Sequence, residues 1–554
     1  MEIELPKPER VRRSRHVTAF SHLGDVFVYH DLYGFILKMS ADVLEFLEAF
    51  GDGANIEELC TSYADRFEGA SPKEFVDVFW EFCCLVAPEG DERPGVLRRF
   101  PVKSKWNVWH RDDDGLVTFV TAWGDRPVST LTLDAAETAV WDALDPEKPL
   151  TALSEQHDAN VITQLTVKLV HNDVQALKLS HFPFSFYKGR ADMQPPYLTS
   201  TMPYAKFSAA AGDAPLSQAE SVSPTNYYQH DIADADEQFD HQETTLSHLF
   251  REPHPALANR TYGQAVVDAL AQRDALPSGT ARILEIGGGL GFFAKAVVEA
   301  LVARELTVEY TIIELSPTLA ATQRERCAGL PVTVVESDIL EAELASDAYD
   351  LIFANEMVGD LPATRLSSAD LDKTEDLGEA GRLIRDHELR LDDAPESFYM
   401  LTGALQLMEK LPAALAPGGT AFITEFGELS QYPRLSTHLD HPELSIHFGW
   451  MQHVAKRFEL QTEYAYVIDL IDMDRDLEGL ASTRSYLRAL CALMKQHGVE
   501  LRKIGYTRQM FDELIAGKID PAQFGDIYFD KIEDRLHGLV PHEFKALMVT
   551  KPAT

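Results

Sequence analysis

The chain has 554 residues, of which 45% are hydrophobic, and it carries 50 Lys and Arg against 88 Asp and Glu, a formal net charge of −38. This length predicts two to four globular domains, and the acidity argues against nucleic-acid binding because a negative surface repels phosphates. The sequence has no apolar run of eighteen residues and no apolar stretch behind a basic N-terminus, so we expect neither a membrane span nor a signal peptide.

The first hundred residues predict a hairpin followed by three helices. Period-two patterns predict strands at Asp25–His30 and Gly34–Lys38. Ser40 is a predicted N-cap, and helices are expected over Ala41–Phe50, over Ile56–Phe67 and from Pro72 onward. This order resembles the PqqD-like, precursor-recognition winged helix, which is seen in systems that modify ribosomally made peptides.

The same order recurs in the second hundred residues. Strands predicted over Leu116–Ala122 and Val128–Leu133 precede Asp134, an N-cap that lies 94 positions after Ser40 (134 − 40). We therefore expect two small α+β winged-helix-like domains, over residues 1–98 and 99–182. Residues 183–240 are rich in Pro, Ser and Ala without periodicity, and they predict an arm or a linker.

The stretch ARILEIGGGLGFF, Ala281–Phe293, predicts a buried strand that runs into a glycine turn and then a helix. Glycines at 287, 289 and 291 let the backbone turn sharply and come close to a ligand. A dinucleotide fingerprint would require glycine at position 292, which is Phe. The shorter E-x-G-x-G-x-G pattern resembles motif I of the class I S-adenosylmethionine (SAM) methyltransferases.

Further strands follow, and polar residues stand at their C-terminal ends. Glu314 ends the predicted strand Val308–Glu314, 23 positions after Gly291 (314 − 291), about where a Rossmann-like unit places the carboxylate that accepts the ribose hydroxyls. Other strands are predicted over Val332–Glu336, Tyr349–Ala354 and Thr420–Phe426. Alternating strands and helices predict a parallel, doubly wound sheet with ligands at the strands' C-terminal ends. The resemblance implies a seven-stranded sheet that Phe544–Lys551 closes antiparallel.

Three longer stretches narrow the resemblance. IELSPTLAATQRERCAGL at 313–330, ANEMVGDLP at 354–362 and TEFG at 424–427 resemble the MidA-like methyltransferases, relatives of a mitochondrial complex I assembly factor that methylates a protein arginine. The pattern E-x-S-P-x-L-x-x-x-Q-x-E-R is the most specific part. Gly359 stands where that family has Asp, with Asp360 next to it, and the family's D-Y-G is Glu425-Phe426-Gly427. These departures leave SAM binding expected and the acceptor open.

The resemblance implies SAM as the cofactor, with Asp338 taking the adenine amino group and Asn355 the methionine amino group. The expected cofactor-binding residues are Glu285, Gly287, Gly288, Gly289, Gly291, Glu314, Asp338, Ile339 and Asn355. A cationic acceptor must also lose a proton, and Glu356 is the candidate base, the alternatives being an N-cap or an internal salt bridge. His254 and His248 are runner-up bases, since histidine titrates near neutral pH.

We expect the methyltransferase domain over residues 241–554, with an acidic helical insertion at 363–397. The segment Ala233–His254, which includes Glu243 and Thr244, predicts either a lid over the cofactor or a surface helix. Five cysteines without metal-ligand spacing predict buried thiols in a reducing cytoplasm. The four histidines between 438 and 453 are interpreted as structural or acceptor-pocket residues and not as metal ligands; they are His438, His441, His447 and His453.

Three functions follow from these features. The first is a methyltransferase that carries its own precursor-recognition domains and modifies a peptide on nitrogen or oxygen. The second is a small-molecule methyltransferase whose N-terminal half shapes the pocket or a homodimer. The third is a protein arginine methyltransferase or an assembly factor whose SAM site has lost its chemistry. The intact glycines, together with Glu314 and Asp338, argue against a site that has lost its chemistry.

Overall fold

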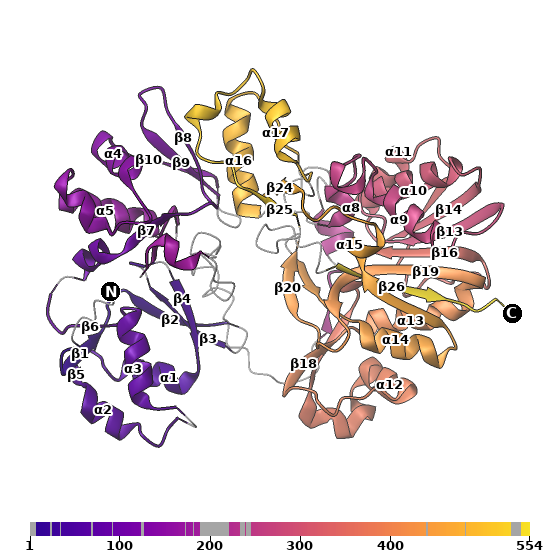
Figure 1. Ribbon diagram of the computed structural model, residues 1–554. Helices are drawn as coiled ribbons and strands as arrows, with labels where there is room; N and C mark the ends of the chain where they lie inside the picture. The colour runs from indigo at the N-terminus through magenta and orange to yellow at the C-terminus, as the bar shows by residue number, and fades with distance from the viewer. Residues whose placement is uncertain are drawn as a thin grey trace. The chain divides into compact units, whose positions relative to one another are not determined.

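The protein is described from a computed structural model. The residues that the structure describes are 7–22, 25–30, 32–33, 35–67, 70–90, 92–122, 127–171, 173–180, 182–188, 221–225, 227–232, 239, 245–438, 441–481, 484–502, 504–532 and 544–553. The chain divides into two compact units (Figure 1). Unit 1 is Met1–Pro215 with Ser485–Glu500 and Ala516–Tyr528, and unit 2 is Leu216–Arg484 with Leu501–Ile515 and Phe529–Thr554.

The first part of unit 1 contains the predicted hairpin and helices. Strands β2 (Val17–His22), β3 (Asp25–His30) and β4 (Phe35–Met39) form an antiparallel sheet in that order. Helix α1 (Ala41–Glu48) follows Ser40, whose hydroxyl accepts the N–H of Val43 as an N-cap. Helix α2 (Ile56–Ser62) ends before the predicted Phe67, and α3 (Pro72–Glu81) begins where Pro72 predicts it. Val28, Phe46 and Phe79 lie in the core that joins the sheet to these helices.

The second part of unit 1 has the same order of elements. Strands β8 (Val108–Arg111), β9 (Val117–Thr121) and β10 (Ser129–Thr132) form a second antiparallel sheet. Helix α4 (Ala135–Ala143) begins with a capping box, in which Asp134 and Glu137 each accept the other's backbone N–H. Helix α5 (Ala159–Val170) covers a core that includes Phe119 and Trp141. Both N-caps that the sequence predicts are therefore present.

A late segment of the chain returns to complete unit 1. Helix α16 (Arg484–Gln496) and residues 516–528 belong to this unit, although the expected domain boundaries place them in the C-terminal domain. The ring of Trp106 meets the rings of Tyr486 and Tyr528 edge-on, with centroids 6.1 and 5.0 Å apart. The Tyr486 hydroxyl accepts the backbone N–H of Tyr528 at 2.9 Å. These aromatic contacts join residues that local sequence patterns do not connect.

Replacing Trp106 by Ala is expected to destabilise unit 1 by about 3 kcal/mol, because a buried indole is lost and the two tyrosine rings lose their partner. Limited proteolysis should then cleave within residues 485–528 faster than in the wild type. Val78→Ala, at an exposed position of α3, is the control and should leave the cleavage rate unchanged. An unchanged rate in Trp106→Ala would contradict the aromatic anchoring of this segment.

Unit 2 is built on a mixed sheet in the order β15-β14-β13-β16-β19-β26-β23, with the short strand β22 pairing with β19. Five neighbouring strands are parallel, and β26 lies antiparallel between β19 and β23, as predicted for the terminal strand. Since β22 joins the sheet, the described sheet has eight strands, which corrects the predicted seven. The strands are β13 (Thr280–Ile286), β14 (Thr307–Glu314), β15 (Val332–Glu336), β16 (Tyr349–Asn355), β19 (Leu415–Glu428), β22 (Ile446–His447), β23 (Gln461–Tyr466) and β26 (Phe544–Thr550).

Helices cover both faces of this sheet (Figure 1). Alternate residues of β13 point to opposite faces, so Ile283 and Leu284 lie in different cores. Ile283 lies with α9 (Tyr262–Ala271) and α10 (Phe292–Val302). Leu284 lies with α13 (Thr402–Ala414) and α14 (Phe448–Arg457). Among the described residues we find no helix whose length and apolar composition would let it cross a lipid bilayer.

The predicted helical insertion at 363–397 differs in kind from the observed segment. It begins with strand β17 (Ala363–Ser367) and ends at the start of β18 (Ser397–Met400), and these strands pair with each other around α12 (Gly378–His387). Further along, β21 (His441–Leu444) pairs with β20 (Leu435–His438) ahead of α14, which begins at Phe448. Strand β23 ends at Tyr466 and continues as a short helix. In the insertion, pairing with distant residues overrides the local pattern.

Candidate active site

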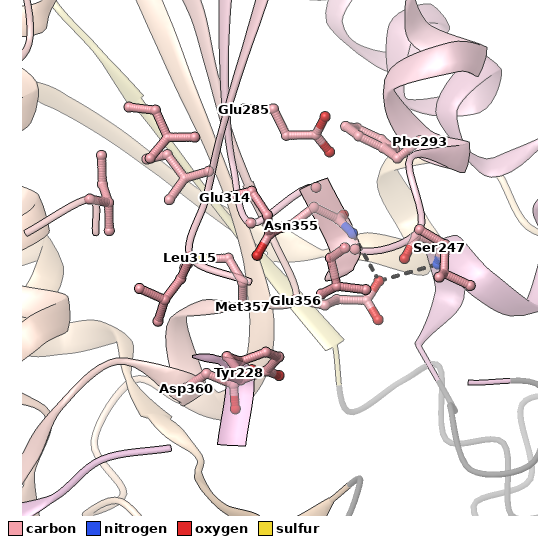
Figure 2. Close-up of a pocket in the computed structure, with 18 of the residues that line it drawn as sticks. Tyr228, Ser247, Glu285, Phe293, Glu314, Leu315, Asn355, Glu356, Met357 and Asp360 are labelled. Atoms are coloured by element: carbon pink, nitrogen blue, oxygen red, sulfur yellow. Dashed lines mark hydrogen bonds between the residues drawn. The ribbon is translucent and has the colours of Figure 1, made fainter. Parts of the chain in front are cut away.

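A cavity in unit 2 lies at the C-terminal ends of the parallel strands, and it encloses about 1080 Å³ of empty space including its mouth (Figure 2). Its lining comes from the glycine turn after β13, the ends of β14, β15 and β16, and the helix α8 (Leu246–Leu249). This is the edge at which doubly wound sheets bind ligands. The cavity therefore lies where the strand order predicts a binding site.

The glycine turn places its backbone against the cavity. Gly287 and Gly289 have φ angles of 67° and 50°, in the left-handed region that favours glycine. A Cβ at position 288 would lie 2.9 Å from Cγ2 of Ile312, so a side chain there would also clash. These three glycines line the cavity. Gly291 is not among the lining residues: it is the N-cap of α10 and lies against Gln323 of α11 (Pro317–Arg326), and its cofactor contact stays a prediction.

Glu314 ends β14 as a buried carboxylate that lines the cavity, with 3% of its surface exposed. Its Oε1 accepts the backbone N–H of Ser316 at 2.9 Å, and its Oε2 accepts Nε2 of Gln323 at 2.7 Å. Burial raises the pKa of Glu314 to about 7, although these hydrogen bonds favour the charged form. The same Gln323 nitrogen donates to the carbonyl of Gly289 at 2.8 Å. One amide therefore joins the predicted ribose carboxylate to the glycine turn.

Several later positions of the pattern that begins at Glu314 make contacts in the structure. The Ser316 hydroxyl accepts the N–H of Leu319 at 3.3 Å and caps α11, and Pro317 occupies the first turn of that helix. The Arg326 guanidinium lies 3.8 Å from the ring centroid of Phe292 and donates to the carbonyl of Leu290. The sequence pattern includes Gln323 but does not by itself indicate a role for it. Its spacing could have predicted the contact, since Gln323 lies nine positions after Glu314 (323 − 314), on the helix that follows it.

Three further predicted cofactor residues lie in the cavity wall. Glu285 is 1% exposed, its Oε2 accepts the Tyr310 hydroxyl at 3.0 Å, and burial raises its pKa to about 8. Asp338 lines the cavity, and its Oδ1 accepts the N–H of Leu340 at 2.8 Å. Ile339 lines the cavity next to it as a buried apolar side chain. Acidic and apolar side chains therefore both line the space where the cofactor is expected.

Asn355 is the last residue of β16, and Glu356 follows it (Figure 2). The Asn355 Oδ1 accepts the hydroxyls of Tyr262 and Thr424, both at 2.9 Å, so its side chain is held firmly at the cavity wall. The Glu356 carboxylate accepts the N–H groups of Leu246 at 2.9 Å and Ser247 at 3.4 Å. Glu356 therefore lines the cavity and also caps the first turn of α8, which is the alternative role considered for it.

The two candidate histidines are in different environments. His248 lines the cavity from α8, with its ring edge-on to Phe292 at 6.3 Å. His254 is not among the lining residues: its Nδ1 accepts the N–H of Ala256 at 3.1 Å, and its Nε2 contacts the Gly505 carbonyl. His254 is buried, and both of its ring nitrogens contact backbone groups, so its role as a base stays a prediction without support from the cavity. Glu243 and Thr244 lie outside the described residues.

The cavity also contains residues that sequence reasoning did not assign. Tyr228 lines it from the short π-helical turn Tyr227–Asp231, and Asp360 lines it from the turn after β16. A Cβ at position 359 would lie 2.7 Å from the Leu444 carbonyl, which explains why glycine precedes the acid here. The sequence could have pointed to Asp360, because it lies one position after the Asp of the family pattern. No local sequence pattern indicates a role for Tyr228.

The cavity lining is strongly acidic. Five carboxylates contribute to it, and no Lys or Arg is found among its described lining residues; the five are Glu285, Glu314, Asp338, Glu356 and Asp360. Such a lining favours cationic groups over anionic ones. SAM carries a sulfonium, an ammonium and two ribose hydroxyls, which the carboxylates and the close glycine backbone fit. Within the described part of the chain, no cluster of three or more His, Cys, Asp or Glu is placed to hold a metal ion.

Comparison with known proteins agrees with this fit. Residues 263–439 match a family model described as a putative S-adenosyl-L-methionine-dependent methyltransferase. A malonyl-[acyl-carrier protein] O-methyltransferase of Anoxybacillus flavithermus is 34% identical over 116 residues, which are 21% of this chain and 41% of that protein. The match thus spans less than half the length of that curated relative. The chain carries a SAM-dependent methyltransferase region, and SAM is its cofactor.

Solved structures with a similar fold are more distant in sequence. Phosphoethanolamine N-methyltransferase 2 of Haemonchus contortus in complex with SAM is 15% identical, with 60% of each chain covered and a TM-score of 0.31. A likely methyl transferase from Burkholderia thailandensis bound to S-adenosyl-homocysteine is 17% identical, with 56% of this chain and 80% of that chain covered and a TM-score of 0.31.

Replacing Glu314 by Ala is expected to weaken SAM binding by about 1.5–3 kcal/mol, the typical worth of a charge-assisted hydrogen bond, here to the ribose. Calorimetry on the full chain measures the change in Kd. Glu336→Ala is a matched control, since Glu336 ends the neighbouring strand in register with Glu314 but is exposed and does not line the cavity. Equal affinities for Glu314→Ala and the wild type would show that this carboxylate does not contact the ribose.

Glu285 is expected to make stability fall as pH rises. Its folded-state pKa of about 8 lies above its ordinary 4.5, so the native state binds the proton more tightly than the unfolded chain does. Relative to Glu285→Gln, the wild type should lose unfolding free energy between pH 4.5 and pH 8, by at most about 5 kcal/mol. Urea unfolding of both proteins across this range measures the loss. Glu314 titrates in both proteins, so its contribution to the unfolding free energy cancels in the comparison. Parallel pH profiles for the wild type and Glu285→Gln would therefore contradict the prediction.

Proposed function

We propose that this protein transfers a methyl group from SAM to a basic nitrogen of a peptide. The observation that carries the proposal is the charge of the cavity, whose described lining contains five carboxylates and neither Lys nor Arg. An amine or a guanidinium is attracted to such a lining, whereas a carboxylate or phosphate acceptor would be repelled. The charge therefore favours N-methylation over methylation of an acidic oxygen.

The residues of the cavity divide into two groups by their position. When bound, SAM supplies a methyl group that its sulfonium already activates, so the chain contributes alignment, a dry site and proton transfer. Glu314 and the glycine turn hold the ribose and methionine end of the cofactor. Glu356 and Asp360, after β16, remain for the acceptor. A protonated amine is unreactive until a nearby base takes its proton.

Unit 1 supports a peptide as the acceptor. In the sheet β2-β3-β4, each outer strand has one hydrogen-bonded neighbour among the described strands, so two edges are open to pairing. An extended peptide binds such an edge through main-chain hydrogen bonds. Val28 of the sheet and Phe79 of α3 share one core, which gives the edge a rigid support. We propose that unit 1 binds the leading part of the peptide and so raises its effective concentration at the methyl group, to about the millimolar range.

Two alternatives use the same cavity. A small amine would satisfy the acidic lining equally well, and unit 1 would then be a scaffold. A protein arginine, suggested by the resemblance to the MidA-like methyltransferases, would also suit the charge. The alternatives differ in how turnover depends on the length and the reactive group of the acceptor.

The test is to incubate the full chain with SAM and short synthetic peptides that each offer one reactive group: an N-terminal amine, Lys, Arg or a side-chain carboxylate. Mass spectrometry should find methylation on nitrogen and none on the carboxylate peptide. Extending a reactive peptide by about ten residues should lower its KM more than it changes kcat, because unit 1 adds binding. Methyl esters as the sole product would overturn the nitrogen acceptor, and equal efficiency with free amines would overturn the peptide.

A further inference from the structure

Three polar side chains from distant parts of the chain meet at the cavity. The Tyr228 hydroxyl donates to Oδ2 of Asp360 at 2.6 Å, and Nε2 of His441 lies 3.2 Å from the same hydroxyl. Nδ1 of His441 lies 3.6 Å from Oδ1 of Asp360. Figure 2 shows Tyr228 beside Asp360. The three residues therefore form one hydrogen-bonded cluster, which we name the Tyr228–Asp360–His441 cluster.

The cluster connects the cavity to the protein interior. Tyr228 and Asp360 line the cavity, whereas His441 is 3% exposed and is not among the lining residues. The His441 ring lies against the rings of Tyr227 and Tyr228, with centroids 4.5 and 5.1 Å away. A proton taken up at the cavity surface thus has a hydroxyl, a carboxylate and an imidazole within reach of one another.

The backbone around Asp360 is held in place. The N–H of Gly359 donates to Oε2 of the buried Glu425 at 3.0 Å, and the Leu444 carbonyl oxygen lies 2.7 Å from where a Cβ of residue 359 would be. His441 and Leu444 are the two ends of β21, so the strand that supports the turn also supplies the imidazole. Such support suits a group whose position must be maintained during a reaction.

Glu356 is less suited to accept a proton. Its carboxylate accepts two backbone N–H groups of α8, and these donors stabilise the charged form. Protonating Glu356 would weaken the start of α8, which lines the same cavity. Asp360 instead accepts from a phenol, whose proton can exchange between the two oxygens without loss of a backbone contact.

We propose that the Tyr228–Asp360–His441 cluster takes the proton that a cationic acceptor nitrogen must lose. One N–H bond of the ammonium breaks, its electron pair stays on nitrogen, and the proton forms an O–H bond with Asp360. The transfer runs directly or through Tyr228, which passes its own proton to Asp360 and receives that of the acceptor. Asp360 is the base, and His441 is a positioning residue that orients Tyr228 and Asp360. This inference rests on the proposed nitrogen acceptor.

The first test uses binding alone. Sinefungin is a SAM analogue with an amine in place of the sulfonium methyl, and S-adenosylhomocysteine carries neither group, so the ratio of their Kd values isolates the amine. Asp360→Asn in the full chain is expected to lower the preference for sinefungin about tenfold or more and to leave the Kd of S-adenosylhomocysteine unchanged. Asp393→Asn is the matched control, because Asp393 also accepts a tyrosine hydroxyl, that of Tyr432 at 2.9 Å, but does not line the cavity.

The second test uses turnover of the N-terminal-amine and Lys peptides. Asp360→Asn should lower kcat by about 10²–10⁴-fold with a small change in KM, and Tyr228→Phe, which removes one oxygen, should lower kcat less. The loss should be larger for Lys than for the N-terminal amine, because the Lys ammonium is the weaker acid. A merely structural role of Asp360 would lower kcat equally for the Lys peptide and for the N-terminal-amine peptide.

The outcomes separate this inference from the proposed function. N-methyl products with wild-type kcat and an unchanged sinefungin preference in Asp360→Asn would overturn the cluster as the base while leaving the nitrogen acceptor intact. Methyl esters as the sole product would overturn the nitrogen acceptor itself. If Asp360→Asn fails to fold, Tyr228→Phe decides: a lowered kcat with the larger loss for the Lys peptide supports the cluster, and a wild-type kcat with both peptides overturns proton transfer through Tyr228.

Discussion

The amide of Gln323 connects the two parts of the cofactor site. It donates to the Glu314 carboxylate at the end of one strand and to the Gly289 carbonyl in the turn after the neighbouring strand. A buried carboxylate without donors would be costly, and a glycine turn without a support would sample many conformations. Gln323 supplies a donor to the carboxylate and a support to the turn. A Cβ at Gly288 would come within 3.1 Å of the Gln323 Nε2, so the helix and the turn approach closely only because residue 288 is glycine.

The acidic groups of the cavity have different partners, and this separates their roles. Glu285 faces a phenol inside the wall, Glu314 accepts backbone and amide donors, and Glu356 holds the start of α8. Burial raises the pKa values of Glu285 and Glu314, because a carboxylate that is removed from water loses the hydration of its charged form. A cationic ligand offsets part of that cost, so the acidic lining favours binding of a sulfonium and a basic acceptor.

The two units have separate hydrophobic cores. Unit 2 contains the whole described lining of the cavity, and unit 1 contains small antiparallel sheets with capped helices. Ser485–Glu500 and Ala516–Tyr528 belong to unit 1, and Leu501–Ile515 between them belongs to unit 2, so the chain passes between the units more than once. This path makes the folding of unit 1 depend on residues near the end of the chain.

Local chemistry determined much of this protein from the sequence alone. The strand and glycine turn at 281–293, the position of Glu314 and the caps Ser40 and Asp134 are each set by neighbours a few residues away. Tertiary structure alone decided which polar groups meet. Glu356 caps α8, His254 turns to a distant carbonyl, and Tyr228, Asp360 and His441 join across more than two hundred positions (441 − 228 = 213). No local pattern encodes such contacts, because they depend on how the chain returns between strands.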